Sequence, residues 1–160
     1  MDALHEGLLR TPPTARELEL AENDFEAYYA ERRDMNFVFT LPGGQQAPRV
    51  ASTEFWLVNE DIFIGRIAVR HELSENLKEF GGHVGYAIRK SQRGKGYGSV
   101  IFNMALPLIK ELGLNRVLIT CDDNNFGSIK IIEKAGGILQ DKIELSYRDV
   151  PHRRYWLEIK

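Results

Sequence analysis

The stretch HVGYAIRKSQRGKGYGS, residues 83 to 99, determines how the rest of the chain is interpreted. Its first part, His83 to Arg89, predicts a strand. Apolar residues then recur with helical spacing from Gly98 to Leu112, and Gly113 is the expected helix stop. The segment therefore predicts a strand that runs through a short glycine-rich loop directly into a helix.

This glycine-rich loop predicts an anion site. The first N–H groups of a helix have no intrahelical partner, and the helix dipole makes that end partly positive. Glycines let the backbone approach an anion closely, and Arg93 and Lys95 add full charges, so a pyrophosphate fits the junction. The residue spacing of this loop does not match either of two common nucleotide-binding motifs. Gly96 follows Lys95 where a Walker A loop needs Ser or Thr, and glycines at 94, 96 and 98 do not form Gly-x-Gly-x-x-Gly.

The chain before residue 83 predicts one helix and a pair of strands. Thr14 to Glu17 has the form of a capping box and opens a helix to about Arg33. Asp34 to Ser52 is interpreted as loop with a short strand at Phe37 to Phe39. Glu54 to Val58 and Ile62 to Val69 form a predicted hairpin.

The chain after the long helix continues as strand, helix and hairpin. Arg116 to Cys121 is nearly all apolar, which is typical of a strand covered on both faces. A helix follows from Asn124 or Asn125 to Ala135, and the last two strands are Ile138 to Tyr147 and Arg153 to Ile159. This order predicts one mixed α/β domain over residues 1–160, with 1–13 as a mobile lead. Pro107 predicts a kink, or a helix that restarts after Ala105.

Composition narrows the class of protein. The chain has 160 residues and a formal net charge of −2, so a nucleic-acid binder is disfavoured. Cys121 is the only cysteine, which excludes an intrachain disulfide and a cysteine-based zinc site, and the histidines lack metal-ligand spacing. We expect Cys121 to be a buried, unreactive thiol. No signal peptide or membrane-spanning run is evident, which predicts a cytoplasmic protein.

Two motifs in order resemble the Gcn5-related N-acetyltransferase (GNAT) family. Arg93-x-x-Gly96-x-Gly98, after a strand and at the start of a helix, resembles the family's motif A. Residues 125 to 137, which read NFGSIKIIEKAGG, resemble motif B. The resemblance covers residues 83–137 well, and Ser128 is similar to the serine of the subgroup that includes ribosomal-protein N-terminal acetyltransferases.

The resemblance implies a mostly antiparallel sheet whose two central parallel strands splay apart, with helices on its faces. Acetyl-CoA would lie in the gap, and no metal would be needed. The backbones of Tyr86 and Ile88 would bind the pantetheine and the acetyl carbonyl, and Asn125 and Ser128 would face the thiol. The pyrophosphate would lie on the backbone N–H groups of Arg93, Gly94, Lys95, Gly96, Tyr97, Gly98 and Ser99.

The resemblance also implies direct attack of an amine on the thioester, with His83 as the first candidate for general base. The alternative for His83 is a structural histidine at a strand start, and the residues leave the two open. Glu54, Glu72 and Glu79 are weaker candidates. Many family members carry a tyrosine where Ile132 stands, so Ser128 is the candidate partner of the leaving thiol, and Tyr147 and Tyr155 on the last hairpin are the alternatives. The family's first strand has no clear match in Met1 to Pro13.

Two other functions remain open from sequence. A non-catalytic acyl-CoA-binding module would bind the cofactor without releasing thiol, and a nucleotide-binding regulatory domain would prefer ATP or NAD. The acceptor amine is not identified by any residue. An exposed final strand would allow two copies to pair as a homodimer, and Arg148, Arg153 and Arg154 are interpreted as solubilising residues of that edge.

Overall fold

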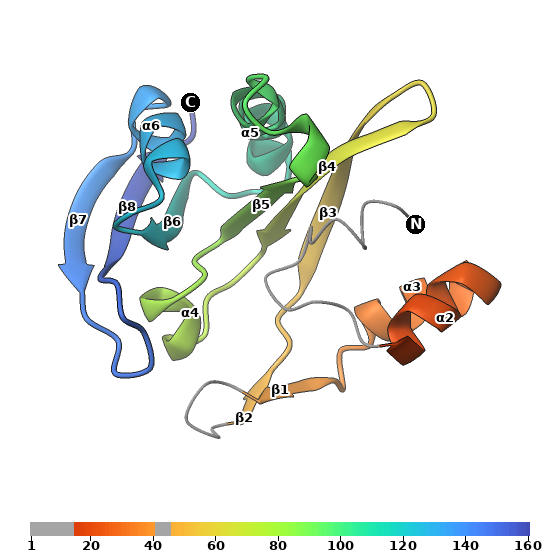
Figure 1. Cartoon of the computed structure of the whole chain (residues 1–160). Coiled ribbons are helices and arrows are strands. Elements are labelled where there is room, and N and C mark those ends of the chain that lie inside the picture. The colour runs from red at the N-terminus through yellow and green to blue at the C-terminus, as the bar shows by residue number, and fades with distance from the viewer. Residues whose placement is uncertain (1–14, 41–45) are drawn as a thin grey trace.

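A computed structural model describes residues 15–40 and 46–160 of the chain (Figure 1). The N-terminal elements are α2 (Ala15–Asn23), α3 (Phe25–Arg33), β1 (Val38–Thr40) and β2 (Gln46–Pro48). The central sheet and its helices are β3 (Ser52–Asn59), β4 (Ile62–Arg70), α4 (Glu75–Glu79), β5 (Val84–Ile88), a 3-10 turn (Lys90–Gln92), α5 (Tyr97–Glu111), β6 (Arg116–Asp122), α6 (Phe126–Lys134), β7 (Ile138–Ile143) and β8 (His152–Glu158).

The main sheet has the strand order β3-β4-β5-β6-β8-β7 and is antiparallel except between β5 and β6. Those two parallel strands share a single register pair, Val84 with Ile119, and then diverge, as Figure 1 shows. The predicted mixed α/β sheet with splayed central strands is therefore confirmed.

Helices α5 and α6 cover one face of the sheet in the region where strands β5 and β6 diverge. The core on this face includes Phe102 of α5, Ile132 of α6 and Tyr155 of β8, all at 0% exposure. A Cβ on Gly98 would lie 2.9 Å from Ile131 Cδ1, so this glycine lets the start of α5 approach α6 closely. Because side chains alternate along a strand, Thr120 of β6 points to the opposite face.

The N-terminal region differs from the sequence prediction. Instead of one helix there are two, because Asp24 Oδ1 accepts the N–H of Ala27 at 2.9 Å and caps a new helix. The predicted strand at Phe37 to Phe39 is found one residue later as β1, and it pairs with β2, which was expected to be loop. Thr14 of the capping box and the segment Met1 to Pro13 lie outside the described residues.

Two further predictions are corrected at the C-terminal side. Helix α5 continues through Pro107, so a restart after Ala105 does not occur. The last strand, β8, lies between β6 and β7 rather than at the edge, so the basis for a homodimer paired through it is wrong. Its arginines are bound to acids instead, Arg153 to Asp123 and Arg154 to Asp141.

Candidate active site

The loop before α5 presents unpaired backbone N–H groups. Gly94 and Gly96 adopt φ of +75° and +84°, a region that favours glycine, and a Cβ at either would meet nothing within 4 Å. No amide of residues 94–98 donates a backbone hydrogen bond within the described chain. The Arg93 amide donates to the carbonyl of Lys90, and the Ser99 amide to that of Gly96. The predicted anion cradle therefore narrows to residues 94–98.

The basic side chains of this loop lie beside the cradle. Arg93 Nε donates to the carbonyl oxygen of Ile88 at 2.9 Å, which fastens the loop to the end of β5. Lys95 Nζ donates to Gln92 Oε1 at 3.0 Å. Both side chains are exposed, so their charges add to the positive end of the α5 dipole.

The backbone of β5 offers hydrogen-bonding groups to the gap. The Arg89 amide donates to Ile64 of β4 at 2.9 Å. Since backbone groups alternate sides along a strand, those of Tyr86 and Ile88 face away from β4 and toward β6. The only β5–β6 register pair is at Val84, so the Tyr86 and Ile88 groups lie where the strands have already parted. This is the arrangement that a pantetheine amide chain needs.

A buried hydroxyl points into the same region. Tyr86 Oη is fully covered and makes no hydrogen bond of normal geometry. Burial raises the pKa of Tyr86 to about 12, while the nearby Ser128 side chain opposes the rise and Cys121 adds to it. The Tyr86 hydroxyl therefore stays protonated and lies beside the Ser128 side chain, between β5 and α6. Sequence reasoning used only the backbone of Tyr86, because an aromatic on a strand is usually core.

The start of α6 contributes one structural and one candidate binding residue. Asn125 Oδ1 accepts the N–H of Ser128 at 3.1 Å, so the Asn125 side chain caps the helix. Ser128 lies one residue before Ile129 of the core and is half-buried beside Tyr86. The structure thus brings Tyr86 and Ser128 together, and it engages Asn125 in a cap.

His83 lies directly before β5, and the residue is 9% exposed. Its backbone N–H donates to the carbonyl of Leu118 at 2.7 Å, and its Nδ1 accepts the N–H of Leu118 at 2.9 Å. Burial, followed by the positive charge of Arg70, lowers the pKa of His83. A neutral ring whose Nδ1 accepts must carry its proton on Nε2, so neither nitrogen is free to take another. The geometry favours the structural alternative for His83.

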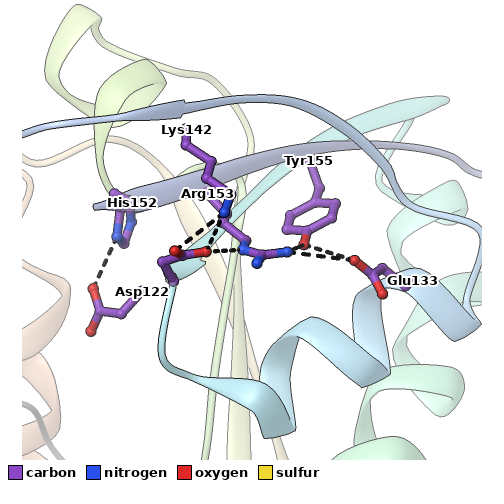
Figure 2. Close-up of polar contacts among 7 residues, drawn as sticks. Asp122, Glu133, Lys142, His152, Arg153 and Tyr155 are labelled. Carbon is purple, nitrogen blue, oxygen red and sulfur yellow. Dashed lines mark hydrogen bonds and ion pairs between the residues drawn. The ribbon is translucent and has the colours of Figure 1, made fainter. Parts of the chain in front are cut away.

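Figure 2 shows the polar side chains at the C-terminal end of β6. Asp123 binds Arg153 of β8 and Lys142 of β7, and Tyr155 Oη donates to Glu133 of α6 at 3.0 Å. Burial raises the pKa of nearby Cys121 to about 11, which confirms the expected buried thiol. The weaker candidate Glu54 is engaged by Arg66 and by Trp56 Nε1.

On the opposite face of the same strands, Asp122, His152 and Thr120 form a connected group. His152 Nδ1 lies 3.0 Å from Asp122 Oδ1, and His152 Nε2 lies 2.9 Å from Thr120 Oγ1. Asp122 and His152 are register partners of β6 and β8. Figure 2 shows His152 and Asp122 directed toward each other. Sequence reasoning missed this group; its one local signal is the spacing of Thr120 and Asp122, which places both on one strand face.

The described part of the chain contains no group of three or more His, Cys, Asp or Glu side chains able to hold a metal ion. Within residues 15–40 and 46–160, no helix has the length and apolarity that crossing a bilayer requires. The open cradle of residues 94–98, the parted β5 and β6, and the buried Tyr86 hydroxyl together fit a phosphorylated ligand with a long amide arm.

A comparison with protein families shows which family the chain belongs to. Residues 5–138 match the acetyltransferase (GNAT) domain family. The chain belongs to the GNAT family. A comparison with curated protein sequences found no match.

Solved structures share the GNAT fold. yncA from Salmonella typhimurium, described as an acetyltransferase and solved with acetyl-CoA, is 12% identical with a TM-score of 0.59 over 99% of this chain and 82% of that one. A spermidine N-acetyltransferase SpeG chimera from Vibrio cholerae and hSSAT is 16% identical, with a TM-score of 0.58 over 85% and 75% of the two chains. ACIAD1637 from Acinetobacter baylyi, also described as an acetyltransferase, is 19% identical, with a TM-score of 0.61 over 98% and 83%. At these identities the likeness shows the fold.

This GNAT protein is an acyl-CoA-dependent N-acetyltransferase that moves an acetyl group from acetyl-CoA to an amine. The family assignment agrees with the sequence prediction of fold, reaction and co-substrate.

Proposed function

We propose that residues 94–98 bind the pyrophosphate of acetyl-CoA and that the parted strands β5 and β6 hold its pantetheine arm. The observation that supports this proposal concerns the backbone N–H groups of residues 94–98. They have no partner in the described chain, and they lie at the start of α5. Five aligned donors at a positive helix end form a charge-assisted site for an anion. Arg93 and Lys95 add charge at its rim.

The β5 backbone then positions the thioester. The N–H groups of Tyr86 and Ile88 and the C=O group of Tyr86 would bind the pantetheine amides and the acetyl carbonyl, as a neighbouring strand would, while the Ile88 carbonyl already accepts Arg93 Nε. Bound acetyl-CoA supplies a carbonyl carbon activated by its thiol leaving group. An N–H held at the carbonyl oxygen stabilises the negative charge that develops there during attack by the amine.

Tyr86 and Ser128 are the proposed partners of the leaving sulfur. The Tyr86 hydroxyl is buried and protonated, and Ser128 lies beside it at the start of α6. A hydroxyl donor there would stabilise the thiolate. Asn125 would act through its cap, which sets the position of Ser128.

The acceptor and cellular setting extend this proposal. Similarity of Ser128 to the ribosomal-protein N-terminal acetyltransferases makes protein N-termini one acceptor class to test, beside polyamines and amino acids. A cytoplasmic location follows from the sequence prediction. A homodimer would have to form through a surface other than β8, because β8 is paired on both sides.

A matched glycine pair tests the cradle. Gly96 and Gly113 lie before and after α5 with φ of +84° and +82°, and neither would place a Cβ near another atom. Gly96→Ala and Gly113→Ala should therefore each destabilise the fold by about 1–2 kcal/mol. Only Gly96→Ala should weaken coenzyme A binding, by about tenfold or more, as measured by calorimetry. Equal affinities in the two variants would refute the proposed cradle.

A further inference from the structure

We propose that Thr120, His152 and Asp122 form a proton relay that deprotonates the attacking amine. The inference rests on the proposed function, because it needs the thioester to lie between β5 and β6. It assigns the role of general base to a group on the face of the sheet opposite α5 and α6.

The position of Thr120 is the first argument. Ile119 forms the last pair with β5, so Thr120 is the first β6 residue beyond the point where the strands part. Its counterpart on β5 is Gly85, where a Cβ would meet only Arg70 Nη1, 3.9 Å away. The mouth of the gap on this face therefore has the Thr120 hydroxyl on one side and a bare glycine on the other. An amine that reaches the thioester from this face passes between them.

The hydrogen bonds fix the direction of proton movement. The Gly81 amide, which can only donate, lies 2.9 Å from Thr120 Oγ1. Asp122 Oδ1 also accepts Arg148 Nη2 at 2.8 Å. A carboxylate accepts only, so His152 Nδ1 carries the hydrogen, and Nε2 of the neutral ring accepts the hydroxyl hydrogen of Thr120. The resulting order is carboxylate, imidazole, hydroxyl.

The surroundings hold the imidazole in place. His152 is 1% exposed, and the Phe80 ring lies over it with centroids 4.7 Å apart. Arg154 lies on the same face of β8 and is bound to Asp141 and to the carbonyl of Lys78. The charged side chains on the elements that pack around His152 include Asp122, Arg148, Arg154, Asp141, Lys78, Glu79 and Arg70. The ring is fixed between two partners, as a positioned base requires.

The transfer balances as follows. The amine nitrogen forms a bond to the thioester carbon, and the carbon–sulfur bond breaks. An amine proton passes to Thr120 Oγ1 while the Thr120 hydroxyl hydrogen passes to His152 Nε2, which leaves an imidazolium facing the Asp122 carboxylate. Coenzyme A departs as thiolate and takes up a proton from solvent, and the His152 imidazolium releases its proton to solvent, which restores the relay. Thr120 is the catalytic residue that touches the amine, and Asp122 is a positioning residue.

His152→Gln is the primary test, because glutamine can hydrogen-bond both Thr120 and Asp122 but cannot take a proton. Thiol release from acetyl-CoA should fall by about 10²–10⁴-fold near neutral pH, and the imidazole limb of the pH–kcat/KM profile should disappear. Thr120→Val should behave likewise. Thr120→Ser keeps the hydroxyl and should retain the limb. Each variant is first tested for thermal stabilisation by coenzyme A, which reports an intact fold and cofactor site.

The outcomes separate the two proposals. If coenzyme A fails to stabilise the wild-type protein, the proposed function is refuted and the relay with it. Suppose that coenzyme A stabilises the variants as much as it stabilises the wild type. If the imidazole-dependent limb of the wild-type pH–kcat/KM profile then persists in His152→Gln or Thr120→Val, the relay alone is refuted. Acetylated Thr120 detected by mass spectrometry in the absence of an amine would also overturn it, because the hydroxyl would then act as a nucleophile.

Discussion

Replacing Tyr86 by phenylalanine should stabilise the free protein while impairing its reaction with acetyl-CoA. The Tyr86 hydroxyl is buried without a normal hydrogen bond. A buried polar group without a partner costs about 1–3 kcal/mol, and the nearby Ser128 side chain places this case at about 1 kcal/mol. The phenylalanine ring keeps the packing against Phe102, whose centroid is 5.5 Å away. Removing the oxygen should therefore raise the free energy of unfolding.

The assay compares thermal unfolding with and without acetyl-CoA. For a domain of this size, 1 kcal/mol corresponds to roughly 2–4 °C in Tm, so the free variant should melt a few degrees higher. The stabilisation added by acetyl-CoA should be smaller than in the wild type, and kcat should fall because the sulfur loses a donor. Ser128→Ala is the matched variant, since it removes the neighbouring hydroxyl but leaves Tyr86 buried. A lower Tm for free Tyr86→Phe would refute the reasoning, because the hydroxyl would then have a stabilising partner.

Three further predictions concern the parted strands. Gly82→Ala should destabilise by about 2–5 kcal/mol, because its φ is +60° and a Cβ would lie 2.4 Å from the Leu118 carbonyl oxygen; Gly85→Ala, which meets no such contact, is the control in urea unfolding. Cys121, with a pKa raised to about 11 and 4% exposure, should react with iodoacetamide at pH 8 only in denaturant; rapid alkylation of the native protein would contradict this. Because the pKa of His83 is lowered on folding, its contribution to stability is present above about pH 6.5 and is lost as pH falls below it. His83→Gln should flatten the pH dependence of stability in that acidic range, and an unchanged slope would contradict the assignment.

The sequence predicted the features that depend on local chemistry. Gly94 and Gly96 mark a loop in which the backbone adopts positive φ, and the apolar spacing from Gly98 to Leu112 predicted the helix. Ile101 and Ala105 of that apolar stripe are buried, whereas Val100 and Met104 are exposed. These residues determine strand, loop and helix within one short stretch, and the family motifs lie there. Both the anion cradle and the order of the later elements followed from them.

What the sequence missed depends on pairing between distant segments. The predicted strands ended at Cys121 and began at Arg153, so Asp122 and His152 each fell one residue outside. In the structure they are partners across β6 and β8. The spacing of Thr120 and Asp122 places both on one strand face, but it gives no sign of His152, because a register between strands separated by a helix and another strand is set by packing. The edge position assigned to the final strand failed for the same reason, since β7 pairs outside β8.

The short break between helices α2 and α3 at Asp24 shows a third limit of prediction from the sequence. Apolar spacing continues through Leu18, Ala21, Phe25 and Tyr28, which favours one helix. The Asp24 carboxylate competes for a backbone amide and starts a second helix there. Periodicity alone cannot decide between an aspartate that points to solvent and one that caps.

The single register pair between β5 and β6 divides the sheet into two pieces that are each continuous in sequence. Residues 52–111 hold β3, β4, β5 and α5, and residues 116–158 hold β6, α6, β7 and β8. A cut between residues 112 and 115 would leave every antiparallel ladder of the main sheet intact within one fragment or the other. We therefore expect two separately made polypeptides, divided between residues 112 and 115, to associate along the boundary between β5 and β6.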